Sequence, residues 1–152
     1  MVKSGLLFLG LLVIPASCMR EPGYLSLMQE VPPKGWSRHD TLTMEMAVRD
    51  SLLLYHIDLI GRLRSVYDQD SLSVVLRVYA PNGTSFTDTL SFGVTHAYDR
   101  IWEDFRFGYC SHVCFTQKGI WRFDLWHHMN TDMLKGVFAI GLYIKREDNG
   151  KK

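Results

Sequence analysis

A hydrophobic pattern with a period of two constrains the fold of this chain more than any other feature. From Leu42 to Val48, apolar side chains alternate with Thr, Glu and Ala, and residues 55–63 and 119–126 repeat the alternation. Successive side chains of a β-strand point to opposite faces, so this period predicts strands that bury one face. No segment combines a 3.6-residue period with helix-capping residues. The pattern therefore predicts an all-β chain.

The remaining strand-like segments predict how the strands are connected. They are residues 72–79, 84–92, 101–109 and 136–145, of which the last is almost entirely apolar, as expected of a central strand buried on both faces. Between the first two lies Pro81-Asn82-Gly83, and Asn-Gly favours a tight hairpin because both residues tolerate positive φ. Strands separated by short turns predict a single antiparallel β-sandwich over residues 41–147, either a jelly roll or immunoglobulin-like.

An apolar run near the N-terminus has the features of an export signal. Lys3 gives a basic start, residues 5–14 are uncharged, and Pro15-Ala16-Ser17 precedes Cys18. The run is shorter than the ~20 residues that a membrane-spanning helix needs. A signal ending at Cys resembles a bacterial lipoprotein signal, although such signals usually have Leu at the position of Pro15. We expect residues 1–17 to be a lipoprotein signal peptide and Cys18 to be lipidated; the alternative is an ordinary signal peptide cleaved nearby.

The segment between the signal and the sandwich is expected to be a tether. Residues 18–40 contain Pro22-Gly23 and Pro32-Pro33, which break regular structure. Tyr24, Leu27 and Trp36 would gain no burial in a free linker. We therefore expect part of the tether to lie against the domain. At the other end of the chain, residues 148–152 are predicted to be a disordered tail.

The charge balance limits the partners that can be expected. Lys3 is the only charged residue of the signal, and its removal brings the 17 basic and 16 acidic residues of the chain into balance. A balanced chain gives no electrostatic reason to expect nucleic acid or anionic lipid as a partner. The chain is long enough for one domain with a real core, and its apolar content of 47% argues against disorder.

Two cysteines remain once Cys18 is assigned to lipid. An exported protein can keep a disulfide, and Cys110-Ser-His-Val-Cys114 could close a small loop. If both residues lie on one strand, however, their Cα atoms are too far apart to be bridged. The sequence leaves these two alternatives open.

No recognised catalytic motif or metal site appears. There is no G-x-S-x-G nucleophile motif and no glycine-rich phosphate loop, so we expect no enzyme activity and no cofactor. Cys110, His112 and Cys114 have the chemistry of Zn²⁺ ligands, but C-x-H-x-C is not a usual spacing. His127 and His128 would point to opposite faces of a strand. We therefore expect no metal and place these histidines on the surface.

Aromatic residues leave a choice between a core and a glycan site. The four tryptophans are Trp36, Trp102, Trp121 and Trp126. Trp121 and Trp126 differ by an odd number of positions, so they should face opposite ways, one in the core and the other exposed or under a loop. Exposed coplanar rings would favour carbohydrate binding, whereas rings in the core or in partner-facing patches would not.

One tripeptide occurs four times. Its copies are Asp40-Thr41-Leu42, Asp50-Ser51-Leu52, Asp70-Ser71-Leu72 and Asp88-Thr89-Leu90. It resembles the acceptor sequence for O-glycosylation of exported proteins in the Bacteroidetes, which makes Thr41, Ser51, Ser71 and Thr89 candidate sites. The structural alternative is that Asp-Ser and Asp-Thr are turn pairs that start strands, with Leu as the first core residue.

Several motifs are spread over the mature chain. They are Tyr24-x-x-Leu27, Gly35-Trp36-x-x-x-Asp40-Thr41, Pro81-Asn82-Gly83, Asp88-Thr89-Leu90, Gly119-x-Trp121-x-Phe123, His128-Met129 and Leu134-x-Gly136-Val137. Behind a lipidated cysteine, this arrangement resembles the gliding-motility lipoprotein GldH family of the Bacteroidetes. The pair Cys110 and Cys114 is not part of the family pattern, and only Cys18 carries over, as the lipidation position.

The resemblance implies a non-enzymatic, lipid-anchored cell-envelope protein. It would bind other proteins of the gliding machinery, or serve the associated type IX secretion or envelope assembly, through an exposed apolar or aromatic patch. The alternative is a glycan-binding module displayed at the cell surface on the same lipid anchor. Met19-Arg20-Glu21 contains no clear acidic surface-export run. We therefore expect the anchor to hold the protein at the outer membrane, on its periplasmic face.

Overall fold

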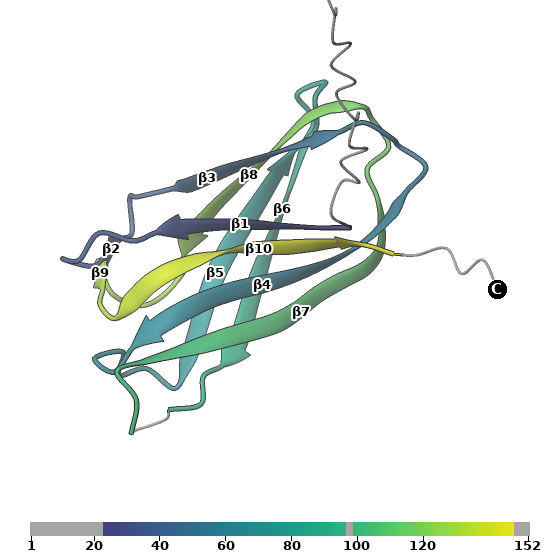
Figure 1. The fold of residues 1–152 in the computed structure, drawn as a ribbon. Coiled ribbons are helices and arrows are strands. Elements are labelled where there is room, and N and C mark those ends of the chain that lie inside the picture. Colours follow the sequence, from purple (N-terminus) through teal and green to yellow (C-terminus); the bar gives the residue numbers. More distant parts are fainter. Residues whose placement is uncertain (1–22, 97–98, 148–152) are drawn as a thin grey trace, which may run out of the picture.

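The computed structural model describes residues 23–96 and 99–147, and within them the chain is all-β, as predicted, with no helix (Figure 1). The strands are β1 (Tyr24–Glu30), β2 (Trp36–Ser37), β3 (Leu42–Val48), β4 (Leu54–Arg64), β5 (Ser71–Tyr79), β6 (Ser85–Gly93), β7 (Trp102–Cys114), β8 (Gly119–His127), β9 (Met133–Leu134) and β10 (Val137–Arg146).

Two four-stranded antiparallel sheets face each other and confirm the predicted sandwich (Figure 1). One sheet has the order β1-β10-β4-β7, the other β3-β8-β5-β6, and β2 pairs separately with β9. The pairs β1–β10, β3–β8, β4–β7 and β5–β6 nest inside one another along the sequence. The chain is therefore one long hairpin rolled into a sandwich, which is the jelly-roll arrangement rather than the immunoglobulin-like one.

The tip of this hairpin is a three-residue turn. Tyr79 pairs with Ser85, and the backbone N–H of Ala80 donates to the carbonyl of Thr84 at 2.8 Å. Gly83 has φ of 87°, as the left-handed position of such a turn requires. Asn82 does not adopt a positive φ, although asparagine tolerates one; its Oδ1 accepts the Thr84 N–H at 3.0 Å. The predicted hairpin is therefore present, and its three-residue loop is Pro81-Asn82-Gly83.

The sandwich begins at Tyr24 rather than at residue 41. Strand β1 pairs with β10 along its whole length, and Trp36 in β2 is fully buried, with its Nε1 donating to the Asp40 carbonyl at 2.9 Å. Most side chains of β1 are exposed, and Leu27 is the one that packs against the core. An edge strand of this kind has no strong alternation, which explains why the sequence suggested a tether.

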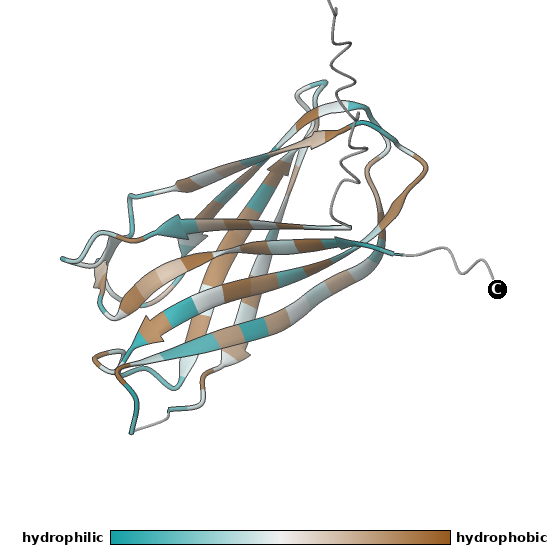
Figure 2. Ribbon diagram, viewed as in Figure 1, coloured by the Kyte–Doolittle hydropathy of each residue, from teal (hydrophilic) through white to brown (hydrophobic). Residues whose placement is uncertain are grey.

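The core lies between the inner faces of the two sheets (Figure 2). Ile140, Leu142 and Ile144 of β10 are at most 1% exposed, and the strand is central, as predicted. It is not buried on both faces, however, because Tyr143 is half-buried and Lys145 is exposed on the outer face. Trp121 points inward and is 8% exposed, whereas Trp126 is half-buried on the outer face, as the odd spacing predicted. At one side of the sandwich, Phe92 of β6 stacks on Phe107 of β7 at a ring-centroid distance of 4.9 Å.

Strand β7 is longer than predicted and contains an irregularity. Its pairing with β4 shifts register between Tyr55 and Ile57, opposite the segment around His112. His112 has φ of 58°, and its backbone N–H donates to Glu147 Oε1 at 2.9 Å. A bulge of this kind places an extra residue in one strand and bends it. Beyond the bulge, β7 continues as far as Cys114.

Gly141 provides a test of the edge pairing. It lies opposite Met28, and a Cβ atom there would overlap the carbonyl of Leu27. We expect Gly141→Ala to displace β1 and lower the free energy of unfolding by about 1–3 kcal/mol, measured by urea denaturation. Gly93→Ala is the control, because its added Cβ would be 3.9 Å from the nearest atom. Equal stability of the two variants would show that β1 tolerates the side chain.

Candidate functional site

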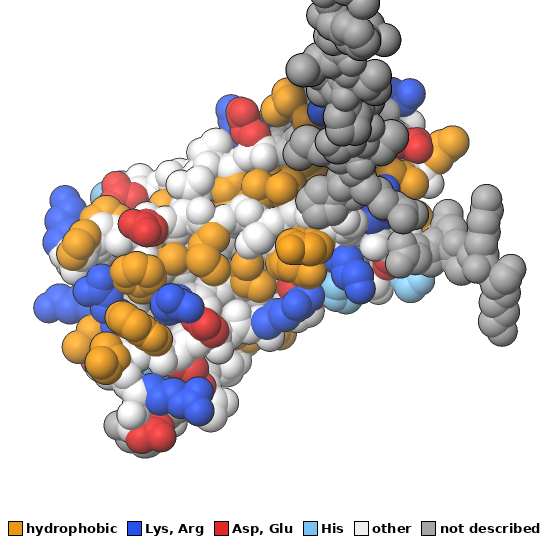
Figure 3. All heavy atoms as spheres, in the orientation of Figure 1, with side chains coloured by type: hydrophobic (Ala, Val, Ile, Leu, Met, Phe, Trp, Pro, Cys, Tyr) orange, Lys and Arg blue, Asp and Glu red, His pale blue; other side chains and the backbone are white. Residues whose placement is uncertain are grey.

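Arginine side chains stack on aromatic rings across the outer face of the β1-β10-β4-β7 sheet. Figure 3 shows basic and hydrophobic side chains side by side on this face. The pairs, with the distance from the guanidinium carbon to the ring centroid, are Arg62–Trp102 (5.7 Å), Arg64–Phe138 (5.1 Å) and Arg106–Tyr143 (4.2 Å). Tyr24 of β1 stacks on Tyr143 at 5.6 Å. We call these seven residues the arginine–aromatic face.

Strand alternation places these residues on the outside. In β4, Leu59 and Leu63 point into the core, so Arg62 and Arg64 point out. In β7, Phe105 packs against the core, and Trp102, Asp104 and Arg106 lie on the opposite face. The pairing register of β4 and β7 places these outward side chains side by side, because Arg62 lies opposite Asp104 and Arg64 lies opposite Trp102.

A buried carboxylate lies in the middle of this outer face. Asp58 is only 2% exposed, although its side chain points away from the core. Its Oδ1 is 2.7 Å from His56 Nε2, and its Oδ2 accepts hydrogen bonds from the Arg106 guanidinium. A buried carboxylate is tolerated only with such partners. No sequence signal marked this residue, because an Asp at an outward strand position normally faces water.

A second ion pair lies in the open. Arg62 Nε donates to Asp104 Oδ1 at 2.6 Å, and its second nitrogen donates to Oδ2 at 3.0 Å. This hydrogen bonding lowers the pKa of Asp104 and raises the pKa of Arg62. Both side chains are accessible, and the neighbouring Trp102 is 51% exposed. Exposed ion pairs add little to stability, so the fold does not depend on this pair.

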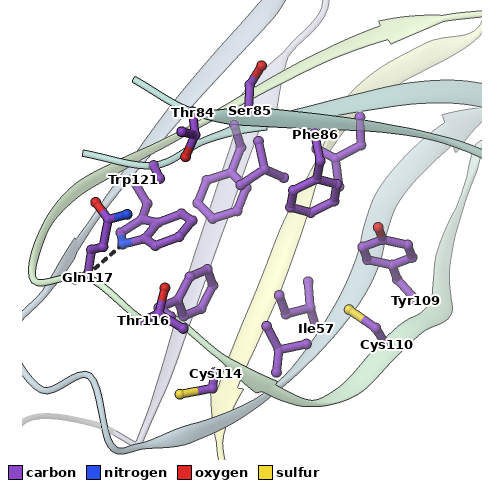
Figure 4. A pocket seen from close by; sticks show the side chains of 16 residues that line it. Ile57, Thr84, Ser85, Phe86, Tyr109, Cys110, Cys114, Thr116, Gln117 and Trp121 are labelled. Carbon is purple, nitrogen blue, oxygen red and sulfur yellow. Dashed lines mark hydrogen bonds between the residues drawn. The ribbon is translucent and has the colours of Figure 1, made fainter. Parts of the chain in front are cut away.

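A cavity of about 360 Å³ opens between the two sheets where β6 and β7 form the edges (Figure 4). Apolar side chains such as Leu76, Val78 and Phe123 form its walls, and Thr84 and Gln117 lie among its polar lining residues. Among the described residues, none that lines the cavity is charged. The bond from the Tyr109 hydroxyl to Asp88 Oδ2, at 3.1 Å, links β7 to β6 beside the cavity.

Both remaining cysteines are free and lie on β7. Cys110 is half-buried in the cavity wall, and burial raises the pKa of its thiol to about 11. Cys114 is exposed, and its Sγ donates to the Ser51 carbonyl at 3.0 Å. A strand advances about 3.3 Å per residue, which keeps residues four apart beyond disulfide distance. Figure 4 shows the two side chains at separate places along the cavity.

The histidines do not come together. His127 was predicted at the surface, but it is 1% exposed and packs edge-on against Trp36 at 5.5 Å between ring centroids. Burial lowers the pKa of His127, and a backbone interaction with Trp36 offsets part of the effect. His112 and His128 are exposed. Over residues 23–96 and 99–147, no group of three His, Cys, Asp or Glu side chains could hold a metal ion.

The four candidate glycosylation residues are spread over the molecule. Thr41, Ser71 and Thr89 are exposed, and Ser51 is half-buried in a turn. The capping role of the tripeptide is visible at Asp50, whose Oδ1 accepts the Leu52 N–H at 2.9 Å. Leu72 and Leu90 are core residues, as the structural alternative predicts, but Leu52 is 82% exposed.

Two further predictions concern Trp126 and the N-terminus. Trp126 is half-buried on the outer face of its sheet, and Arg77 lies over its ring at 5.3 Å, so it is not a fully exposed ring. Residues 1–17 and Cys18 lie outside the described residues. Within the described part of the chain, no helix has the length and hydropathy to cross a membrane.

Comparison with known proteins gives one family match. The family model described as GldH lipoprotein matches residues 24–144. Among solved structures, the coat protein of Tobacco streak virus is 9% identical, with a TM-score of 0.31; the similarity covers 87% of this chain and 91% of that chain. No curated protein matches this chain.

The two ion pairs should differ in their importance for stability. We expect Arg106→Ala to lower the free energy of unfolding by about 1–3 kcal/mol, because it leaves the buried Asp58 carboxylate with His56 alone. Arg62→Ala removes the exposed pair with Asp104 and should leave stability nearly unchanged. Thermal unfolding of both variants measures the difference, and equal losses would contradict this assignment.

Proposed function

Because this chain belongs to the GldH lipoprotein family, we propose that it works by binding other proteins of the gliding machinery, or of the associated type IX secretion or envelope assembly. Lipoprotein family membership implies a membrane-anchored protein of the cell envelope. We place the anchor at Cys18 and the protein on the periplasmic face of the outer membrane. The proposed role is non-enzymatic.

The arginine–aromatic face is the observation that supports this proposal. Tyr24 is 55% exposed and Trp102 is 51% exposed, on a sheet face that also presents Met28. Tyrosine, tryptophan and arginine are the residues most enriched at the energetic centres of protein interfaces. Guanidinium groups already stacked on rings suit a partner surface that offers carboxylates and aromatic or apolar side chains.

The buried pair behind this face favours a preformed binding surface. Asp58 holds Arg106 against Tyr143, and Tyr143 in turn supports Tyr24. A long side chain that is fixed before binding loses less conformational entropy when the partner arrives. The face therefore combines a rigid centre with the exposed ion pair of Arg62 and the exposed ring of Trp102 at one end.

The lipid anchor has a direct test. We expect Cys18→Ala to abolish metabolic labelling with a fatty acid and to release the protein from membranes into the soluble fraction. Several acyl chains hold a lipoprotein firmly because each buried CH₂ contributes about 0.8 kcal/mol. A Cys18→Ala protein that stays membrane-bound and acylated would show that the anchor is elsewhere.

Partner binding can be tested with two matched positions. A photo-crosslinking phenylalanine analogue replaces Trp102 in one variant and Trp126 in the other, because each ring has an arginine over it on opposite sheets. We expect ultraviolet light to give discrete adducts with envelope proteins at position 102 only. Adding Arg64→Ala to the position-102 variant should weaken the adducts about fivefold.

The same pair of positions separates the two candidate functions. Equal adduct patterns at both positions would reject the arginine–aromatic face as the partner surface. Binding to a glycan array that is lost in Trp126→Ala would favour the glycan-binding alternative instead.

A further inference from the structure

Several segments meet where the chain enters the sandwich. The Gly23 carbonyl accepts the Arg146 N–H at 2.7 Å, and the Glu147 N–H donates to the Leu54 carbonyl at 2.8 Å. The beginning of β1, the end of β10 and the beginning of β4 therefore lie side by side (Figure 1). The turn between β3 and β4, residues 49–53, belongs to the same group. We call this group the tether end.

Leu52 stands out at the tether end. It is 82% exposed on a turn in which two bonds hold the Ser51–Leu52 peptide unit: the Leu52 N–H donates to Asp50 Oδ1, and the Ser51 carbonyl accepts from Cys114 Sγ. Leu72 and Leu90, in two other copies of the same tripeptide, are buried in the core. The turn thus holds an apolar side chain in the solvent at a defined place.

The length of the tether determines which end of the sandwich can reach a membrane. Five residues lead from Cys18 to Gly23, and an extended chain spans at most about 3.6 Å per residue, or roughly 18 Å in all. A nine-residue strand such as β5 is about 30 Å long. A lipid on Cys18 would therefore keep the tether end at the bilayer and hold the opposite end away from it.

We propose that the tether end lies on the lipid surface with Leu52 inserted at the boundary between headgroups and acyl chains. This inference rests on the proposed lipidation of Cys18. One leucine would bind a bilayer weakly from solution. The tether, however, turns insertion into an intramolecular event with a high effective concentration, so a weak contact is enough.

The charges at this end indicate that insertion is apolar rather than electrostatic. Among the described residues here, the basic Arg49, Lys118, Lys145 and Arg146 are accompanied by the acidic Asp50 and Glu147, an excess of two positive charges. Binding to anionic headgroups relies on clusters of roughly 4–8 basic residues, which this end does not have once its acidic residues are counted. The contact should therefore persist when the ionic strength is raised.

Site-specific fluorescence tests this orientation on the lipidated full chain. In a Cys110→Ser, Cys114→Ser background, Leu52→Cys or Val66→Cys carries the environment-sensitive dye NBD. Val66 is the matched control, because it is an exposed apolar residue, 64% accessible, in the β4–β5 loop. The protein is reconstituted in vesicles of phosphatidylethanolamine and phosphatidylglycerol that contain spin-labelled lipids. Circular dichroism confirms that each variant is folded.

We expect the dye at position 52 to be quenched at least about twofold more strongly than at position 66, at low and at high salt. Equal quenching at both positions, or none at position 52 in protein that floats with the vesicles, would overturn the orientation and leave the anchor standing. Quenching that disappears at high salt would replace apolar insertion with an electrostatic contact. Failure to float would overturn the anchor and this inference together. No partner protein is present, so these outcomes are independent of partner binding.

Discussion

The pairing of β10 with β4 is the contact on which the rest of the structure depends. Strand β10 is the last strand of the chain, and it lies in the middle of its sheet, between β1 and β4. Its inward side chains fill the core, while its outward Tyr143 lies opposite Asp58 in the register of the pair. A shift of one residue would turn every side chain of β10 to the other face. The core and the arginine–aromatic face are thus set by one register.

The same register explains how an outer sheet face can contain a buried carboxylate. Asp58 lies opposite Tyr143, next to His56 and under the Arg106 guanidinium, which come from neighbouring strand positions. Breaking a buried pair is usually far more destabilising than losing an exposed one. The exposed Arg62–Asp104 pair on the same face has no comparable structural role. One face therefore contains both an arginine that holds a buried carboxylate and an arginine whose ion pair is open to solvent.

Much of the fold could be predicted from local pattern, and the rest depended on tertiary contacts. The alternation in β3, β4 and β8 predicted those strands, and Pro81-Asn82-Gly83 predicted the hairpin that became the tip of the jelly roll. Strand β1 was missed because an exposed edge strand needs few apolar side chains once β10 supplies its hydrogen bonds. The extension of β7 was missed because it passes through the bulge at His112, where Glu147 from the far end of the chain binds the backbone.

The candidate site was less predictable than the strands. An interface patch rich in aromatic residues was expected in general terms, but its arginine pairs come from β4, β7 and β10, which the linear sequence does not show to be neighbours. The burial of Asp58 and His127 likewise depends on side chains from distant segments. Leu52 was also not predictable from its motif. The same tripeptide places Leu72 and Leu90 in the core, but it leaves Leu52 exposed.

The hydrogen bond between Arg146 and Gly23 has a practical consequence for work on this protein in living cells. It places the end of β10 beside the residue where the chain enters the domain, so a fluorescent protein or affinity tag fused at the C-terminus would follow on from the end that carries the proposed lipid anchor. If Cys18 is lipidated, such a fusion would crowd the bilayer and tilt the domain. An insertion in the β4–β5 loop, which leads from Arg64 to Ser71, would instead project from the far end of the sandwich and leave the attachment undisturbed.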